Sequence, residues 1–518
     1  MSRLSKIALG IAATLIIITS AALLWVLVLF DPSDHRDRIA GWINAQTGYE
    51  IALDGPIDFS LGFPSGGGIG LRLTLESAAV VSISGVAPSQ PMMINRFALS
   101  ISLHNLRKAF RGEGFKAEGD FDVSEVDIRS LTSGLDIDWS LFVPRAFRHA
   151  AGTGRFEFNE ERLRLSDLDL VLARTPIRGV ASVSNWRAAP ALAFDLEIPA
   201  LEMSHMLPIE QQSFFDGLIL LNLPAFALAS IDALGQLQIG SLRSGGILMT
   251  DVAIPLRSRA GVVVSSPITA RLYGGSASID SIMLTSPEGV SLGSIQRLEN
   301  VAVGSALADL NLTDVVEATA NLDMVLSFAG PDLGSGMESL QGAILLESQS
   351  GRIKGIDVEK LIGQLARQDT SDDSWHGDQA STPINALVAT AKIENGTAVN
   401  KDLAMQIANL DTRGYGRYDF DSEGISYRLL LSLAGSDVAK MLPPPLNSGL
   451  LVLPLQIGGT RESPQMAIDM TTFLQLQFNH LMGGASPIKP PAKDPQIMTL
   501  AEKLRADIRE RIARAHTR

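Results

Sequence analysis

The sequence contains no cysteine among its 518 residues, which excludes disulfide bonds, thiolate catalysis and cysteine metal sites. Basic side chains are in the minority, with 43 Lys and Arg against 56 Asp and Glu, and they form no cluster in the body of the chain. The net charge of −13 disfavours a nucleic acid as partner, because nucleic acids select basic surfaces. We therefore expect no nucleic-acid partner.

Catalytic and metal-binding motifs are also scarce. The seven histidines are scattered and form no His-x-x-x-His motif. The stretch Ser65–Gly70 is rich in glycine but lacks the Gly-Lys-Ser/Thr ending of a phosphate loop, so we interpret it as a turn. Asp372, Asp373, His376 and Asp378 have metal-ligand chemistry, although an exposed loop is the favoured interpretation. We expect a protein that is not an enzyme and that needs no metal or cofactor.

The sequence contains a single long apolar run. It extends without a charge from Ile7 to Phe30 and would measure about 36 Å as a helix, enough to cross a bilayer core of about 30 Å. Arg3 and Lys6 precede it, and Asp31 follows it, so the positive-inside rule places the N-terminus in the cytoplasm. A cleaved signal peptide is the alternative, but its apolar core would span only about 7–15 residues. We predict an uncleaved anchor.

Most of the remaining chain alternates between apolar and polar residues. Strict alternation predicts strands with one apolar face, because successive side chains of a strand point to opposite sides of the sheet. We expect a mainly β architecture, an elongated, curved antiparallel sheet or groove with few short helices. Its apolar wall is predicted to include Leu71, Leu73, Leu75, Leu99, Ile101, Leu326, Leu429 and Leu431.

Three stretches predict helices. The first lies between Asp34 and Gly48, with Ile39, Trp42 and Ile43 on one face, and the second spans 358–365. The third follows a proline-rich linker at 486–495 and repeats apolar residues every four positions from Leu500 to Ile512. This basic amphipathic tail is typical of helices that lie on anionic membranes or on partner helices. Docking on the protein itself, or fraying in solvent, fits the same pattern.

One segment recurs within the chain. The sequence SDLDLVLARTPIRGVASV at 166–183 aligns without gaps to KDLAMQIANLDTRGYGRY at 401–418, and the Asp-Leu and Arg-Gly pairs keep their separation. A third segment at 250–261 resembles them less closely. Recurrence of this kind predicts a sheet built from repeats that bury one face against their neighbours.

Motifs at both ends of the chain resemble the AsmA family of Gram-negative inner-membrane proteins. The N-terminal signature comprises Phe30, Asp31, Pro32, Thr47, Gly48, Leu53 and Gly55. Near the C-terminus, GRIKGIDVEKLIGQL at 351–365 resembles the Gly-x-Ile-x-Gly-Ile-Asp start of a helix in the family's terminal domain. The resemblance implies the architecture of bridge-like lipid-transfer proteins, a role in phospholipid traffic or outer-membrane assembly, and no established catalytic residues.

These observations define four regions and two functional hypotheses. The regions are an anchor at 1–30, an N-terminal β region at 31–240, a C-terminal β domain at 241–472, and a linker with a helical tail at 473–518. The first hypothesis is a periplasmic apolar groove, anchored in the inner membrane, that conveys phospholipid towards the outer membrane. The second is a non-enzymatic assembly factor that influences outer-membrane protein targeting through protein contacts. Partners in either case would be phospholipid or outer-membrane assembly and lipid-transport proteins.

Overall fold

The computed structural model describes about two thirds of the chain, mostly as strands and short helices. The residues it describes are 36–37, 40–41, 49–64, 68–83, 92–111, 116–126, 150–159, 161–172, 174–185, 191–203, 232–244, 246–286, 289–309, 316–331, 339–360, 374–407, 410–420, 422–432, 452–460, 463–482 and 493–517. The predicted anchor lies outside these ranges, as do Ile39, Trp42 and Ile43 of the first predicted helix. None of the helices within them is long and apolar enough to cross a membrane.

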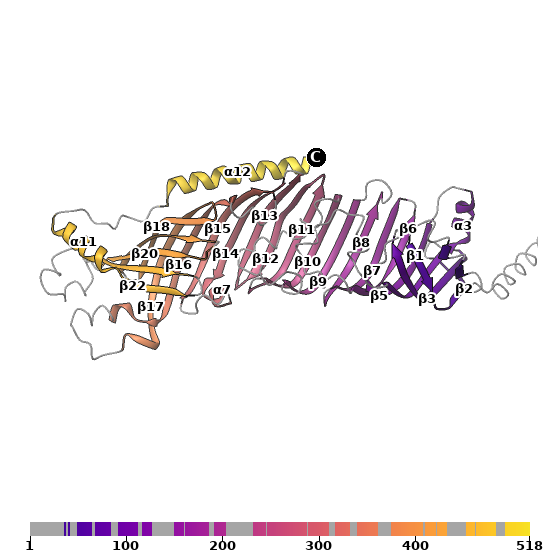
Figure 1. Cartoon of the computed structure of the whole chain (residues 1–518), viewed down its shortest axis with the longest axis horizontal. Coiled ribbons are helices and arrows are strands. Elements are labelled where there is room, and N and C mark those ends of the chain that lie inside the picture. Colours follow the sequence, from indigo (N-terminus) through magenta and orange to yellow (C-terminus); the bar gives the residue numbers. More distant parts are fainter. Residues whose placement is uncertain are drawn as a thin grey trace, which may run out of the picture. The chain divides into compact units, whose positions relative to one another are not determined.

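The predicted mainly β fold is confirmed, and contacts divide the chain into two units (Figure 1). Unit 1 comprises residues 1–200 and 205–208, and unit 2 comprises residues 201–204 and 209–518. The elements that begin in unit 1 are β1 (Tyr49–Leu53), β2 (Ile57–Gly62), β3 (Gly70–Ile83), β4 (Met92–Ser102), α3 (Leu103–Phe110), β5 (Lys116–Val126), β6 (Ala150–Asn159), β7 (Arg162–Leu172), β8 (Thr175–Ser184) and β9 (Ala191–Glu202).

Unit 2 continues the same antiparallel pattern. Its strands are β10 (Asp232–Ser244), β11 (Ile247–Arg259), β12 (Val262–Leu272), β13 (Gly275–Ser286), β14 (Gly289–Ala302), β15 (Val316–Gly330), β16 (Gln341–Ile356), β17 (His376–Glu394), β18 (Thr397–Ile407), β19 (Leu410–Asp419), β20 (Ile425–Ser432), β21 (Val452–Gly459) and β22 (Pro464–Ile468). Its named helices are α7 (Val303–Asp309), α11 (Met470–Leu481) and α12 (Pro495–Thr517). Of the helix predicted at 358–365, Val358–Lys360 is helical and the rest lies outside the described residues.

Strand order follows chain order within each unit. In unit 1, β3 pairs with β2 along its first half and with β1 along its second half, and β4 to β9 then follow one another. In unit 2, each strand from β10 to β22 pairs with the next along the chain.

The predicted repeat is visible in the register of two hairpins. Leu168 pairs with Gly179 in β7–β8, and Leu403 pairs with Gly414 in β18–β19, at the equivalent positions of the aligned segments. Each hairpin also shifts register just before that leucine. The less similar third segment shares the backbone of the first, since Asp167 has φ 49° and Asp251 has φ 50°. These shared irregularities show that the sheet repeats at the level of backbone geometry, because bulges are specific features of a strand pair.

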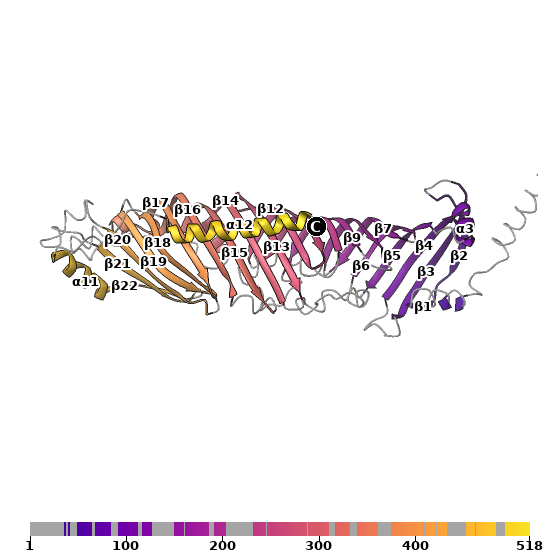
Figure 2. The ribbon, with the colours of Figure 1, turned by 90° about the horizontal axis from the view of Figure 1, so that it is seen from above.

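The C-terminal helix docks on the sheet. Figure 2 shows α12 lying lengthwise across the strands of unit 2, and it contacts every strand from β12 to β17. Ile508 is fully buried against Val264, Ile282, Ile295 and Val325. Of the alternatives that the basic amphipathic pattern left open, docking on the protein is the one that the structure shows.

Polar contacts reinforce this docking along the length of α12. The Lys493 ammonium lies 2.6 Å from the carboxylate of Glu347 just before the helix, and the Arg511 guanidinium donates to the Ser291 hydroxyl at 3.2 Å further along it. Gly293 permits the close approach, because a Cβ there would lie 2.8 Å from a side-chain carbon of Ile508.

Candidate functional site

The apolar face of unit 1 begins where β3 lies between β2 and β4. Leu71 pairs with Ile101, Leu73 pairs with Leu99, and Leu75 pairs with Phe97. Directly paired residues of antiparallel strands point to the same side of the sheet. Five of the eight predicted wall residues therefore share one face of unit 1.

The same face extends across the other strands of the unit. Register carries it from Phe97 to Phe121 on β5, from Gly119 to Phe156 on β6, and from there to Leu165 on β7. On β8 and β9 it continues through the pairs Ala181–Phe194, Gly179–Leu196 and Val183–Leu192. The wall is thus apolar from β2 to β9, and the five residues predicted from alternation form its part on β3 and β4.

Sequence reasoning missed how glycine and phenylalanine interlock on this face. A Cβ on Gly119 would lie 1.8 Å from the carbonyl oxygen of Ala98 and 2.7 Å from the ring of Phe156. The Phe156 ring therefore extends across Gly119 and stacks on Phe97, with ring centroids 5.0 Å apart and planes at 11°. Gly154 accommodates the ring of Phe121 in the same way. The glycines among alternating apolar residues are the only sequence signal of this packing.

The opposite face of unit 1 is charged. Arg72, which lies between Leu71 and Leu73, forms an ion pair with Asp120 at 2.6 Å. Arg155 pairs with Asp167 at 3.3 Å, and Arg178 pairs with Asp169 at 3.5 Å. These pairs are largely exposed, so they add little stability but keep this face hydrated. One face of unit 1 is therefore hydrated, and the other can contact apolar groups.

Exposure differs along the apolar face of unit 1. Leu75, Phe156 and Leu168 are buried, whereas Leu71, Leu73, Leu99 and Ile101 are only half-buried. Within the described ranges, the main packing partners of each strand are its sheet neighbours, with α3 added at β3 and β4. No described helix or strand of unit 1 forms a second layer over these leucines.

The remaining three wall residues lie in unit 2. Leu326 on β15 pairs with Ser294 and Gly342, and is separated by β16 to β19 from Leu429 and Leu431 on β20. Leu431 is only 2% exposed, and Leu429 packs on a buried cluster that includes Leu403 and Met405. The structure thus brings Leu429 and Leu431 together and leaves Leu326 elsewhere on the sheet. Leu431 is buried, whereas Leu326 and Leu429 are half-buried like most of the predicted wall residues of unit 1.

A buried polar row crosses the sheet of unit 2. Ser265, Ser281 and Ser294 pair in register across β12, β13 and β14, and all are almost fully buried. The side chain of Gln296 is also buried and donates to the Ser294 hydroxyl at 3.3 Å. Alternation alone did not identify this row, because isolated serines occur throughout the sequence. Because of this row, the face of unit 2 that includes Leu326 is less uniformly apolar than the wall of unit 1.

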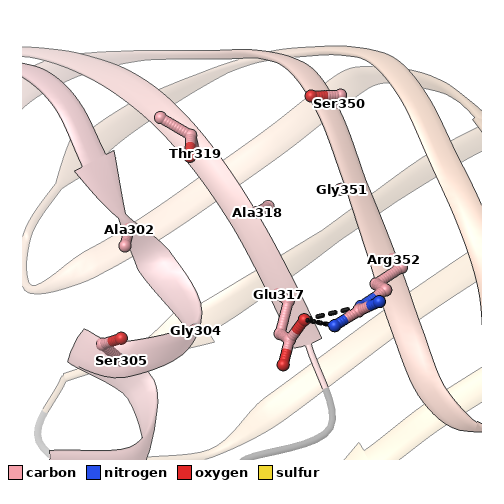
Figure 3. A pocket seen from close by; sticks show the side chains of 9 residues that line it. All are labelled: Ala302, Gly304, Ser305, Glu317, Ala318, Thr319, Ser350, Gly351 and Arg352. Atoms are coloured by element: carbon pink, nitrogen blue, oxygen red, sulfur yellow. Dashed lines mark hydrogen bonds and ion pairs between the residues drawn. The ribbon is translucent and has the colours of Figure 1, made fainter.

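Unit 2 contains two cavities, of which the first is mainly polar. The first, of about 480 Å³, lies between α7 and the strands β15 and β16 (Figure 3). Figure 3 shows Glu317 and Arg352 pointing toward each other across it, and their charged groups are 2.6 Å apart. The hydrogen bond from Arg352 lowers the pKa of Glu317 below its ordinary value, and Lys354 at 3.4 Å adds to this effect. Such a lining is unsuited to an acyl chain.

The second cavity, of about 460 Å³, lies over β18, β19 and β20. Tyr427 donates its hydroxyl to Asn400 at 2.5 Å, and its burial raises its pKa above the ordinary value. Arg428 donates to Asp469, the residue before α11, at 2.7 Å and to the Tyr415 hydroxyl at 3.0 Å. These contacts fasten α11 to the end of the sheet.

The candidate metal cluster is only partly described. Asp372 and Asp373 lie outside the described residues, while His376 and Asp378 are exposed at the start of β17, where the His376 ring lies 4.7 Å from that of Trp375. In the part of the chain that the structure covers, no three His, Asp or Glu side chains gather as a metal site would require.

Comparisons with known proteins agree with the resemblance seen in the sequence. Residues 227–403 match the model of the AsmA family. This segment is therefore similar to the AsmA family. The chain is also 21% identical over 363 residues to the protein AsmA of Escherichia coli strain K12. That alignment covers 63% of this chain and 58% of the relative, so the chain spans little more than half of the relative's length. No solved structure matches the chain.

The family match covers β10 to most of β18 and includes Leu326, but not the other seven wall residues. The half-exposed wall of unit 1 lies outside the matched segment. We therefore infer the function of this wall from its own geometry.

Proposed function

We propose that this protein is anchored in the inner membrane and binds phospholipid acyl chains on its apolar sheet face, conveying lipid towards the outer membrane. The observation that carries the proposal is the half-exposed wall formed by Leu71, Leu73, Leu99 and Ile101 in unit 1. Apolar area left in water costs about 25 cal/mol per Å², so an extended bare wall favours an apolar occupant. An acyl chain covers such a wall while its headgroup stays in water.

The arrangement of charge supports the same proposal. Ion pairs of Arg72 and Arg96 with Asp120 lie on the opposite face of strands β3 to β5, away from the wall. A charge on the wall would have to lose its hydration whenever an acyl chain bound there, at a cost of several kcal/mol. The family's implied role in phospholipid traffic or outer-membrane assembly is consistent with this division.

Native mass spectrometry of the full chain, extracted in mild detergent, tests the proposal. We expect phospholipid masses to remain on the protein and to be lost in Leu99→Asp, which places a charge on the wall. Ser100→Asp is the matched control, because Ser100 is the next residue on β4 and points to the opposite face. A wild-type chain that carries no phospholipid would contradict lipid binding.

The proposed location has its own test. The uncharged run from Ile7 to Phe30 is proposed to anchor the chain, with both units in the periplasm. A phosphatase that is active only outside the cytoplasm should be active when fused after Arg518. A fluorescent protein that matures only in the cytoplasm should be dark at the same site, and the opposite pattern would refute this topology.

One observation favours the second candidate function, an assembly factor for outer-membrane proteins. Leu474, Phe478 and Met482 are exposed at four-residue spacing along and just beyond α11, and that helix carries no acidic or basic side chain apart from His480. Exposed apolar stripes on helices are typical of protein docking surfaces. A photo-crosslinker at Phe478 that captures envelope proteins, combined with no lipid on the wall, would favour this candidate.

A further inference from the structure

The exposed apolar side chains of unit 1 concentrate at one end of three strands. Phe63 is 83% exposed, Ile69 51%, Leu61 43% and Leu103 40%. Single exposed apolar residues are common on protein surfaces, but a contiguous group marks an interaction site. We refer to these four residues as the tip patch.

The four residues of the tip patch lie at the same end of strands β2 to β4. Leu61 pairs with Leu71 near the end of β2, and the backbone N–H of Leu103 donates to the carbonyl of Ile69 at 3.0 Å. Leu71 pairs in turn with Ile101. Leu61 therefore lies on the apolar face that forms the candidate lipid wall, and Phe63, Ile69 and Leu103 lie where that face ends.

Basic side chains border the patch. Helix α3 starts at Leu103, directly after β4, and the Ser102 hydroxyl caps it by accepting from the backbone N–H of Asn105 at 3.1 Å. Arg107 and Lys108 in its last turn are exposed, as is Arg111 just after it, and the helix contains no acidic residue. An apolar edge bordered by cations is complementary to the interface of an anionic bilayer, where acyl chains lie beneath phosphate groups.

We propose that the tip patch inserts into the headgroup region of an anionic bilayer, with Arg107, Lys108 and Arg111 on lipid phosphates. This inference rests on the proposed function and extends it, because it places the end of the apolar wall where phospholipid enters from the membrane. Leu61 and Leu103 then lie at acyl-chain depth, and Leu71 and Ile101 follow along the wall.

Because the chain lacks cysteine, one introduced cysteine gives a single labelling site for the test. The full chain carrying Phe63→Cys is labelled with a polarity-sensitive fluorophore and reconstituted into nanodiscs that contain phosphatidylglycerol and a spin-labelled lipid. Ile69→Cys provides a second site on the patch. Val180→Cys is the control, because Val180 is 38% exposed in the same unit but lies on β8, away from the patch.

We expect the spin-labelled lipid to quench the fluorophore at Phe63 and Ile69 at least twofold more strongly than at Val180. The double substitution Arg107→Glu with Lys108→Glu should remove most of that difference, and so should nanodiscs of phosphatidylcholine alone. Quenching at the patch no stronger than at Val180 would overturn the proposal. A blue shift without quenching that grows with protein concentration would also overturn it and assign the patch to a second copy of the chain.

Failure of this proposal is distinguishable from failure of the proposed function. Nanodisc quenching reports where the patch lies and requires no lipid on the wall. Native mass spectrometry reports lipid on the wall and requires no contact of the patch with a membrane.

Discussion

At the residue scale, the fit between Gly119 and Phe156 decides how the apolar wall packs. Replacing Gly119 with alanine should destabilise the fold by about 1–3 kcal/mol, because the added carbon would overlap the Ala98 carbonyl and the Phe156 ring. Urea unfolding of the full chain in detergent measures the change. Gly458→Ala is the control, since the nearest atom to a Cβ at that position lies 3.9 Å away, and equal stability of the two variants would contradict the packing described.

Asp469 predicts a pH dependence. Hydrogen bonds from the backbone N–H and the hydroxyl of Thr472 lower its pKa below the ordinary value, and Arg428 adds to the shift. A carboxylate whose pKa is lowered by folding stabilises the fold above its unfolded pKa, near 4, and loses that contribution as the pH falls through the folded value.

The difference in unfolding free energy between wild type and Asp469→Asn should therefore be constant from pH 7 to about 5 and shrink below about pH 4. Urea unfolding at pH 7 and pH 3 measures it. Thr472→Val should reduce the pH dependence, because it removes the hydroxyl donor. A difference that stays the same at both pH values would show that Asp469 is not stabilised as its contacts imply.

The two-residue period of a strand was sufficient to predict which residues of β3 share a face. Alternation placed Leu71, Leu73 and Leu75 on one side and Arg72 on the other, and the register of β3 and β4 has this arrangement. It did not indicate that Leu431 would be buried while Leu73 stays half-exposed, because burial depends on what lies across the sheet. Nor did it pair Gly119 with Phe156, which are distant in sequence and meet only through strand register.

At the element scale, the docking of α12 depends on Ile508. Ile508→Ala should destabilise the folded chain by about 2–5 kcal/mol, because the side chain is fully buried among Val264, Ile282, Ile295 and Val325. Hydrogen exchange of α12 should become faster in this variant. Arg509→Ala changes an exposed neighbour and should alter stability by no more than about 0.5 kcal/mol. Unchanged exchange in Ile508→Ala would contradict docking in solution.

The tail helix also shows what an element's sequence leaves undecided. A four-residue apolar stripe predicts a helix with one apolar face, and α12 is that helix. The stripe does not specify its partner, because a bilayer, another helix and a sheet all bury apolar area. The residues that make the sheet the partner lie on other elements. Val264, Ile282 and Ile295 form an apolar surface of unit 2 beneath the helix. Alternation of apolar and polar residues on β12 to β14 is weak because residues on both faces of these strands are buried.

The repeat was predictable because it is recorded in local sequence. The bulges before Leu168 and Leu403 occupy equivalent positions in the two hairpins, and so do Gly179 and Gly414. Ungapped alignment of 166–183 with 401–418 was sufficient to find the relationship. Each glycine pairs with its leucine across the strand pair.

At the scale of the whole molecule, the architecture of the sheets is observed and their occupation by lipid is proposed. In each unit, consecutive antiparallel strands form an open sheet, and in unit 1 one face is charged while the other is apolar and half-exposed. Residues 227–403 of unit 2 are similar to the AsmA family. The central claim is that phospholipid occupies the apolar face, and this claim concerns Leu73 and Leu99 more directly than any residue of unit 2.

Site-specific photo-crosslinking in living cells tests that claim most directly. A photoreactive amino acid at Leu73 or Leu99 lies on the wall, and the same amino acid at Thr74 or Ser100 lies one residue away on the opposite face. The account predicts phospholipid adducts at Leu73 and Leu99 and none at Thr74 and Ser100, detected by mass spectrometry of the purified chain. Lipid adducts on both faces alike, or protein adducts alone at Leu73 and Leu99, would contradict it.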